Sequence, residues 1–155
     1  MRLCEQTKIV PIIEPEDHQG GVDGDSVSLE NYRHVTFIFT FGELTGDAVL
    51  TVNSGATAGT KTTAETFNYR ATSADLKNAS GDALGTEATS AALTLTAATY
   101  EDRMLVVEMD ASEFTASQPW ITPALSDAAS ELLVSCVAVL SNPRYAQNVP
   151  PTAIA

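Results

Sequence analysis

Apolar and polar residues alternate along RHVTFIFTF, residues 33–41. Val35 and all three phenylalanines share one register, and Ile38 is the one apolar residue in the other. Side chains of a β-strand point to alternate faces, so a period of two predicts a strand with one face in a core. The alternation returns at residues 48–53 and 66–70, after turns that contain glycine. The sequence therefore predicts a sheet with one buried face.

Strand-like patterns recur along most of the chain. They fall at residues 33–41, 47–53, 64–71, 91–97, 103–109, 119–125 and 131–140. Many short strands separated by turns predict an all-β fold, here a single antiparallel β-sandwich that is jelly-roll-like. Met104–Met109 and Leu132–Leu140 are almost continuously apolar, which indicates central strands covered on both faces.

The predicted core takes one or two residues from each strand. It consists of Phe37, Phe39, Leu50, Val52, Phe67, Leu95, Val106, Val134 and Cys136. The segment after Trp120 allows two interpretations, because Thr122 and Pro123 could also cap and open a helix. We favour a strand as far as Leu125, followed by a turn.

Both ends of the chain differ from this pattern. Residues 1–30 are predicted to form an N-terminal arm, residues 31–141 the β-sandwich domain, and residues 142–155 a C-terminal extended arm. Proline punctuates both ends and removes a backbone donor, which disfavours a central strand. Each end still carries apolar residues, which are costly to expose without a partner. We therefore expect interface contacts from Ile9, Ile12, Ile13, Tyr145, Val149 and Ile154.

The charge of the chain limits its partners. It has 20 acidic and 8 basic residues, a net charge of −12. Binding to nucleic acid or to anionic membranes requires several lysines or arginines, so we expect neither partner. The start, MRLCE, has no apolar signal region and no run is long enough to span a bilayer, so we expect a chain made in a cytoplasm.

No group of residues suggests catalysis or a cofactor. His18 and His34 are the two histidines, and no nucleophile motif accompanies them, so we expect a protein that is not an enzyme. Asp23 and Asp25 alternate in a glycine-rich loop, which is typical of a solvated turn and, as an alternative, of an ion site. We expect no metal, and we expect both cysteines to be unpaired, with Cys136 in the core.

Three stretches carry a resemblance: SLENYRHVTFIFTFGELTGDAVLTV, ETFNYRAT and LLVSCVAVLSNPRYAQNVPPTAIA. They resemble small structural proteins encoded among the head genes of tailed bacteriophages. In that group a leader runs into an Asn-Tyr pair, then a strand, a glycine turn and a second strand, and the chain closes with a strand, an Arg-Tyr pair and a proline-containing tail. The positions that match these pairs are Asn31, Tyr32, Arg144 and Tyr145. The stretch from Thr72 to Ser90 carries none of the resemblance.

The resemblance implies a virion component, a decoration or cement protein on the capsid surface, assembled in the host cytoplasm. Its implied partners are the major capsid protein and further copies of itself, as a homo-oligomer for which a trimer is one candidate. Two other classes stay open: another virion part, such as a tail or neck protein, and a β-sandwich that binds carbohydrate or a cell surface. The segment at Arg144 and Tyr145 could equally pack on its own domain or dock on a neighbour.

Overall fold

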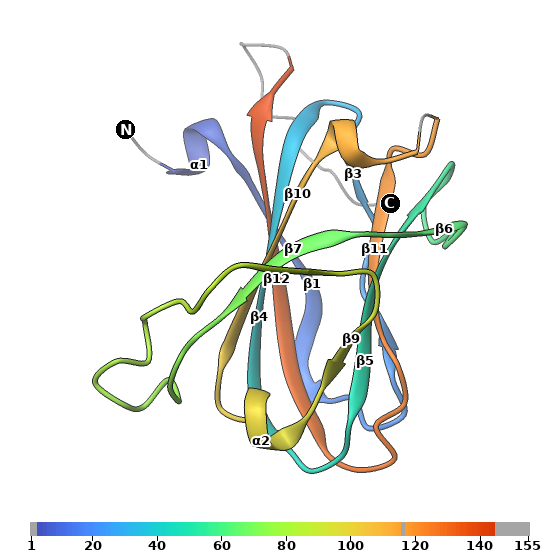
Figure 1. Ribbon diagram of the computed structural model, residues 1–155. Coiled ribbons are helices and arrows are strands. Elements are labelled where there is room, and N and C mark those ends of the chain that lie inside the picture. The colour runs from blue at the N-terminus through green and yellow to red at the C-terminus, as the bar shows by residue number, and fades with distance from the viewer. Residues whose placement is uncertain (1–2, 116, 145–155) are drawn as a thin grey trace.

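Two antiparallel sheets pack face to face and enclose a common core (Figure 1). The computed structural model describes residues 3–115 and 117–144. The predicted all-β sandwich is therefore confirmed, and its jelly-roll connectivity stays a prediction. Short helical turns join some strands: α1 (Leu3–Gln6), α2 (Ala97–Tyr100) and a 3₁₀ turn (Ala111–Glu113).

We call the two sheets sheet A and sheet B. Sheet A has the order β1 (Lys8–Asp17), β12 (Leu132–Pro143), β4 (Tyr32–Leu44), β10 (Met104–Asp110), β7 (Phe67–Ala71) and β8 (Ala88–Ser90). Sheet B has the order β2 (Val22–Asp23), β11 (Trp120–Leu125), β5 (Ala48–Gly55) and β6 (Thr63–Glu65). Two short strands extend sheet B, since β3 (Val27–Ser28) pairs with β11 and β9 (Leu93–Leu95) pairs with β5.

The core forms around the phenylalanines of β4. Phe37, Phe39 and Phe41 are fully buried, and the rings of Phe39 and Phe41 stack with their centroids 6.2 Å apart. Tyr100 of α2 packs edge-on against Phe41. Eight of the nine predicted core residues are buried, which confirms those predictions.

Val106 is the exception and corrects the prediction for β10. The strand alternates, with Leu105, Val107 and Met109 buried and Val106 half-buried on the other face. β12 alternates in the same way. The expectation that both strands are covered on both faces is therefore wrong within this subunit, because their outward residues keep contact with solvent.

The predicted N-terminal arm is wrong for Lys8–Asp17. This segment is β1, the edge strand of sheet A, and it pairs with β12 from Lys8↔Leu140 to Asp17↔Leu133. Prolines are tolerated there because an edge strand needs hydrogen bonds on one side only. The register shifts on either side of Ile13, so both Ile12 and Ile13 are buried.

The other end of the domain also extends further than predicted. β12 continues to Pro143, which pairs with Tyr32, so residues 142 and 143 belong to the sheet and not to an arm. Residues 145–155 lie outside the described part of the chain. In sheet B, β11 ends at Leu125, which confirms the strand interpretation of the segment after Trp120.

Both cysteines are free thiols, as predicted. Cys4 is exposed in α1 and Cys136 is buried on the inner face of sheet A. Burial raises the pKa of the Cys136 thiol well above its usual value, because the surroundings disfavour the thiolate.

Candidate functional site: the outer face of sheet A

A row of apolar residues crosses the outer face of sheet A. The strand register places Pro11 of β1 beside Val137 of β12, Val137 beside Ile38 of β4, and Ile38 beside Val106 of β10. Pro11 is exposed and the other three are half-buried. Neighbouring strands lie about 4.8 Å apart, so the row spans roughly 15 Å.

A second row adds to this surface. Ile9 of β1 lies beside Val139 of β12, and Val139 lies beside Thr36 of β4. We call the six apolar residues of the two rows the apolar face: Ile9, Pro11, Ile38, Val106, Val137 and Val139. Charged residues border both rows, since Arg70 of β7 lies beside Val106 and Glu108 of β10 lies beside Thr36.

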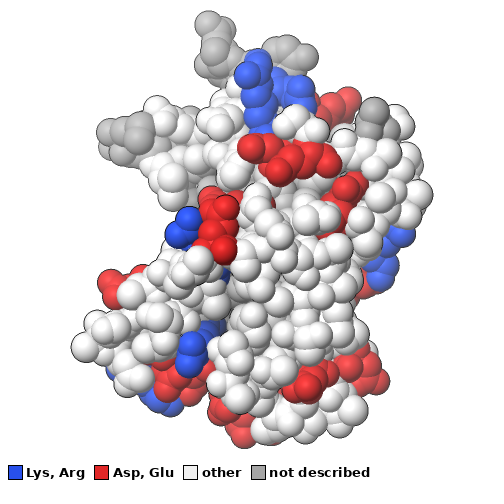
Figure 2. Space-filling view, in the orientation of Figure 1, with Lys and Arg blue, Asp and Glu red and all other residues white. Residues whose placement is uncertain are grey.

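Large exposed hydrophobic residues also gather on the elements of sheet A. Among the described residues they are Leu3, Ile9, Leu76, Leu84 and Leu133, each 41–58% exposed. All five belong to a strand of sheet A, to α1 or to the loop between β7 and β8. α1 and that loop project from the same side of the molecule, and its surface is hollowed between them (Figures 1 and 2).

Polar groups border the apolar face where β4 begins. His34 is half-buried, and its Nδ1 lies 2.8 Å from Oδ1 of Asp110. Its Nε2 lies 3.6 Å from Oε1 of Glu108 and 3.3 Å from Oγ1 of Thr36. Sequence reasoning found no acid near His34, because both carboxylates come from β10, more than 70 residues further along the chain.

The predicted interface residues have different positions in the structure. Ile9 is exposed on the apolar face, Arg144 is exposed beyond the end of β12, and Asn31 is half-buried. Ile12, Ile13 and Tyr32 are buried inside the subunit, so they are not available to a partner of the folded domain. Tyr145, Val149 and Ile154 lie outside the described residues.

Tyr32 packs in the core under the segment that contains Asn31. Desolvation raises the pKa of Tyr32. Its hydroxyl is buried and finds no hydrogen-bond partner in the described part of the chain. The backbone around it is well bonded, because the amide of Arg144 donates to the Asn31 carbonyl at 2.9 Å. Asn31 and Tyr32 therefore support the fold at this end.

The acidic loop at Asp23 is tied down by an ion pair. Nζ of Lys61 donates to both carboxylate oxygens of Asp23, at 2.6 and 2.7 Å. Asp25 is exposed, and its amide bonds to the Ile12 carbonyl. Within residues 3–115 and 117–144, no group of three His, Cys, Asp or Glu residues is placed to hold a metal. These contacts favour the solvated-turn interpretation over an ion site.

One acidic side chain among the described residues is buried. Glu65 of β6 is only 8% exposed, and its Oε1 accepts hydrogen bonds from Oγ of Ser54 at 2.5 Å and from the Thr115 amide at 3.3 Å. Gln118 also contacts Oγ of Ser54, at 2.7 Å. The carboxylate therefore fastens the segment around Thr115 to sheet B.

No helix in the described segments is long and apolar enough to cross a membrane.

Comparison with known proteins gives a structural likeness but no match in sequence. No protein-family model matches the chain, and no curated protein sequence matches it. Among solved structures, the SPBc2 prophage-derived protein YomS is similar, with a TM-score of 0.48 and 10% sequence identity. The likeness covers 86% of this chain and 94% of that one.

Proposed function

We propose that this chain is a virion structural protein of a tailed bacteriophage, a non-catalytic decoration protein that binds the outside of the capsid. The apolar face is the observation that carries a binding role. Exposed apolar surface of this kind is typical of protein–protein interfaces, because covering it releases roughly 25 cal/mol for each Å² removed from water. The resemblance of the three sequence stretches supports the virion.

The arrangement of the face suits a repeated, flat partner. Its residues come from four adjacent strands, so their positions are fixed by backbone hydrogen bonds and not by flexible loops. A rigid surface loses little conformational entropy on docking. Many copies on one lattice multiply weak contacts through avidity. The major capsid protein is therefore the proposed partner, with other virion parts as the second candidate.

Carbohydrate binding has less support. Sugar platforms need exposed aromatic rings, and no aromatic side chain of the described residues is exposed by more than about a third of its surface. Trp120 and Phe114 are half-buried, and the phenylalanines of β4 are in the core. These positions favour an assembly surface over a glycan site.

The test uses a charged variant of the apolar face. Ile38→Asp combined with Val137→Asp places two carboxylates in the middle row, where they would be desolvated by any docked partner. The matched control, Thr51→Asp combined with Asn53→Asp, adds the same charge to the outer face of sheet B. Binding of each purified variant to heads of the phage that encodes the chain is measured by co-sedimentation.

We expect the sheet A variant to lose at least about 100-fold in affinity, and the control to stay within about threefold. Thermal unfolding confirms that both variants are folded. Equal binding by both variants would contradict docking through the apolar face. Binding to purified tails, with none to heads, would assign the protein to another part of the virion.

A further inference from the structure

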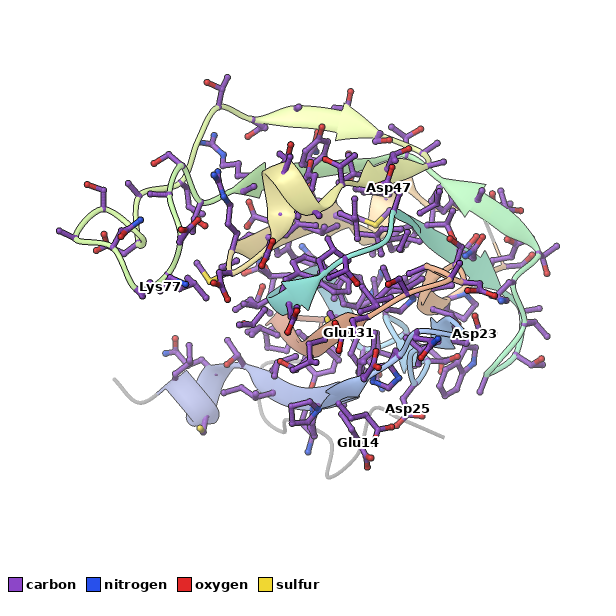
Figure 3. The ribbon with its side chains drawn as sticks, turned by 90° about the horizontal axis from the view of Figure 1, so that it is seen from below. Glu14, Asp23, Asp25, Asp47, Lys77 and Glu131 are labelled. Carbon is purple, nitrogen blue, oxygen red and sulfur yellow. The ribbon has the colours of Figure 1, made fainter. Side chains whose placement is uncertain are left out.

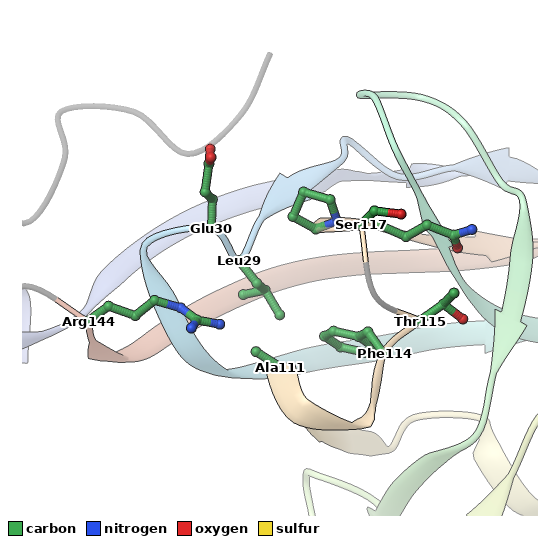
Figure 4. A pocket seen from close by; sticks show the side chains of 9 residues that line it. Leu29, Glu30, Ala111, Phe114, Thr115, Ser117 and Arg144 are labelled. Atoms are coloured by element: carbon green, nitrogen blue, oxygen red, sulfur yellow. The ribbon is translucent and has the colours of Figure 1, made fainter.

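Two arginines lie together at one end of the sandwich, where β4 begins and β12 ends. Arg33 and Arg144 are both exposed, and both line an open pocket of about 400 Å³ together with Asp110, Ser112 and Asn142. Arg144 also borders an adjacent pocket of about 370 Å³ with an apolar wall from Leu29 and Phe114 (Figure 4). We call this end the arginine end.

Arg144 is held in position by the backbone of the preceding segment. Its amide donates to the Asn31 carbonyl at 2.9 Å, and its Nε lies 3.4 Å from the Tyr32 carbonyl. Within the described residues the two terminal nitrogens of the guanidinium make no hydrogen bond, and Figure 4 shows the group directed into the pocket. Two carboxylates border these pockets: Asp110, which lies 2.8 Å from Nδ1 of His34, and Glu30, which is exposed beside Arg144 in the second pocket.

The two arginines differ from most other cations of the chain. Lys61, Arg70, Lys77 and Arg103 each face a carboxylate, of Asp23, Glu87, Asp102 and Asp75 respectively. Within the described residues, neither Arg33 nor Arg144 has an ion pair, although acids outnumber bases by 20 to 8. Two like charges at one pocket are unfavourable unless an anion joins them. The guanidinium fork matches a carboxylate with two parallel hydrogen bonds.

The opposite end of the sandwich gathers carboxylates. Glu43, Asp47, Asp127 and Glu131 are exposed at the far ends of β4, β5, β11 and β12, and none of them has an ion pair within the described residues. Glu101, just before β10, has Lys77 as a neighbouring cation. Asp47 and Glu131 lie at this end in the view from below (Figure 3), and red surface follows the lower rim in Figure 2. We call this the acidic end. β4 has 13 residues at about 3.3 Å each, so the two ends are roughly 40 Å apart.

We propose that the arginine end of one copy binds the acidic end of a second copy, so that subunits associate head to tail. The carboxylates of the second copy occupy the pocket at Arg33 and Arg144. At physiological salt the Debye length is about 8 Å, so close pairs still attract while the repulsion between distant charges of two acidic subunits is screened. A heterologous contact of this kind closes into a ring or continues as a filament. It deepens the proposed function by naming a contact between copies, and leaves the apolar face free for the capsid.

The experiment reverses the charge of each end in turn. Arg33→Glu with Arg144→Glu changes the arginine end, and Asp47→Lys with Glu131→Lys changes the acidic end. Sedimentation velocity of the full chain, at concentrations up to about 1 mM in 0.15 M salt, measures association. We expect the native chain to associate, each variant alone to be monomeric, an equimolar mixture of the two to associate again, and 1 M salt to dissociate the complexes.

The control is Lys61→Glu with Lys77→Glu, which makes the same change in net charge at cations that already have partners. It should associate like the native chain. A native chain that stays monomeric, association that survives either end reversal, or a mixture that fails to associate would each overturn the proposal. Capsid binding of the same variants is measured separately. If the native chain stays monomeric but still binds capsids, the contact between copies is wrong and the proposed function stands.

Discussion

Sheet A and sheet B contribute inner faces to one core, but their outer faces differ. Inside, Phe37 and Phe39 of sheet A pack in the same core as Leu50 and Val52 of sheet B. Outside, sheet A presents the apolar face. The outer positions of the two paired central strands of sheet B are the polar Thr51, Asn53 and Thr122 and the apolar Val49, Ala124 and Trp120.

Part of the outer face of sheet B is covered by the chain itself. Thr122 is 2% exposed because its hydroxyl meets that of Ser26 at 2.7 Å, and Ser26 in turn accepts a hydrogen bond from the Gly59 amide. The loops around Ser26 and Gly59 therefore cover the outer face of sheet B at Thr122. The apolar face has no such cover within the described residues, since its six members are half-buried or exposed. The proposed function assigns this open apolar surface to a partner.

The edge strand of sheet A gives the largest expected effect. Deleting residues 1–13 removes Val10, Ile12 and Ile13 from the core, at roughly 1.5–3 kcal/mol each. That loss is comparable to the whole stability of an ordinary domain, about 5–15 kcal/mol, so we expect no cooperative thermal unfolding transition. Ile9→Thr, a change at an exposed position of the same strand, should alter stability by less than about 0.5 kcal/mol. A truncated chain that melts within a few degrees of the native one would show that β1 is dispensable.

The sequence predicts an arm where the structure has β1, and the difference has a physical reason. Pro11 and Pro15 disfavour a central strand, and the segment was therefore predicted to be an arm. Only its pairing with β12, more than 100 residues away, shows that the prolines lie at an edge. The buried face of β4 is predicted correctly, because the two registers of that strand differ sharply in polarity.

The second prediction compares the two faces of β4 at neighbouring positions. Phe39 is fully buried, and Phe39→Ala should cost about 3–5 kcal/mol in the free energy of unfolding, because it leaves a cavity. Ile38→Ala, one residue away on the apolar face, should cost less than about 1.5 kcal/mol. Denaturant titration at constant pH measures both. Similar costs for the two variants would mean that the outer face is packed within the subunit.

The candidate site could be predicted only in part. Ile38 stood out as an apolar residue in the polar register of β4, and Val137 and Val139 lay in an apolar run whose outward residues could not be identified. The run Met104–Met109 has the same ambiguity, so Val106 was assigned to the core. Long-range register resolves both, since Val107 pairs with Phe37 and Val106 with Ile38. This pairing joins strands that are far apart in the sequence, and an apolar run that fills both registers leaves its inward face open.

The third prediction tests the cover of sheet B. Thr122→Val keeps the shape of the side chain but removes the hydroxyl that bonds to Ser26, inside a region that water does not reach. We expect a loss of about 1–2 kcal/mol in the free energy of unfolding. Thr51→Val is the control, because Thr51 is only half-buried on the same outer face and should change stability by less than about 0.5 kcal/mol. Equal effects would mean that the hydrogen bond to Ser26 contributes little.

The last and smallest effect concerns the inner face of sheet A, through the pH dependence of stability. Burial raises the pKa of Cys136 in the folded state, whereas in the unfolded chain the thiol titrates near about 8.5. Below that pH both states hold the proton and stability is unaffected. Above it the unfolded state alone loses the proton, so folding weakens by up to about 1.4 kcal/mol for each pH unit until the folded pKa is reached.

Denaturant titrations at pH 8 and pH 9.5 measure this loss, in a Cys4→Ser background that prevents disulfide-linked dimers. We expect about 1 kcal/mol less stability at pH 9.5, and a clearly smaller difference in the further variant Cys136→Ala. The raised pKa values of Tyr32 and Tyr100 lower stability at higher pH in the same way in the chains with and without Cys136→Ala, so their effects cancel in the comparison. An equal loss in both chains would show that Cys136 is not the group responsible, and that the inner face of sheet A admits the thiolate.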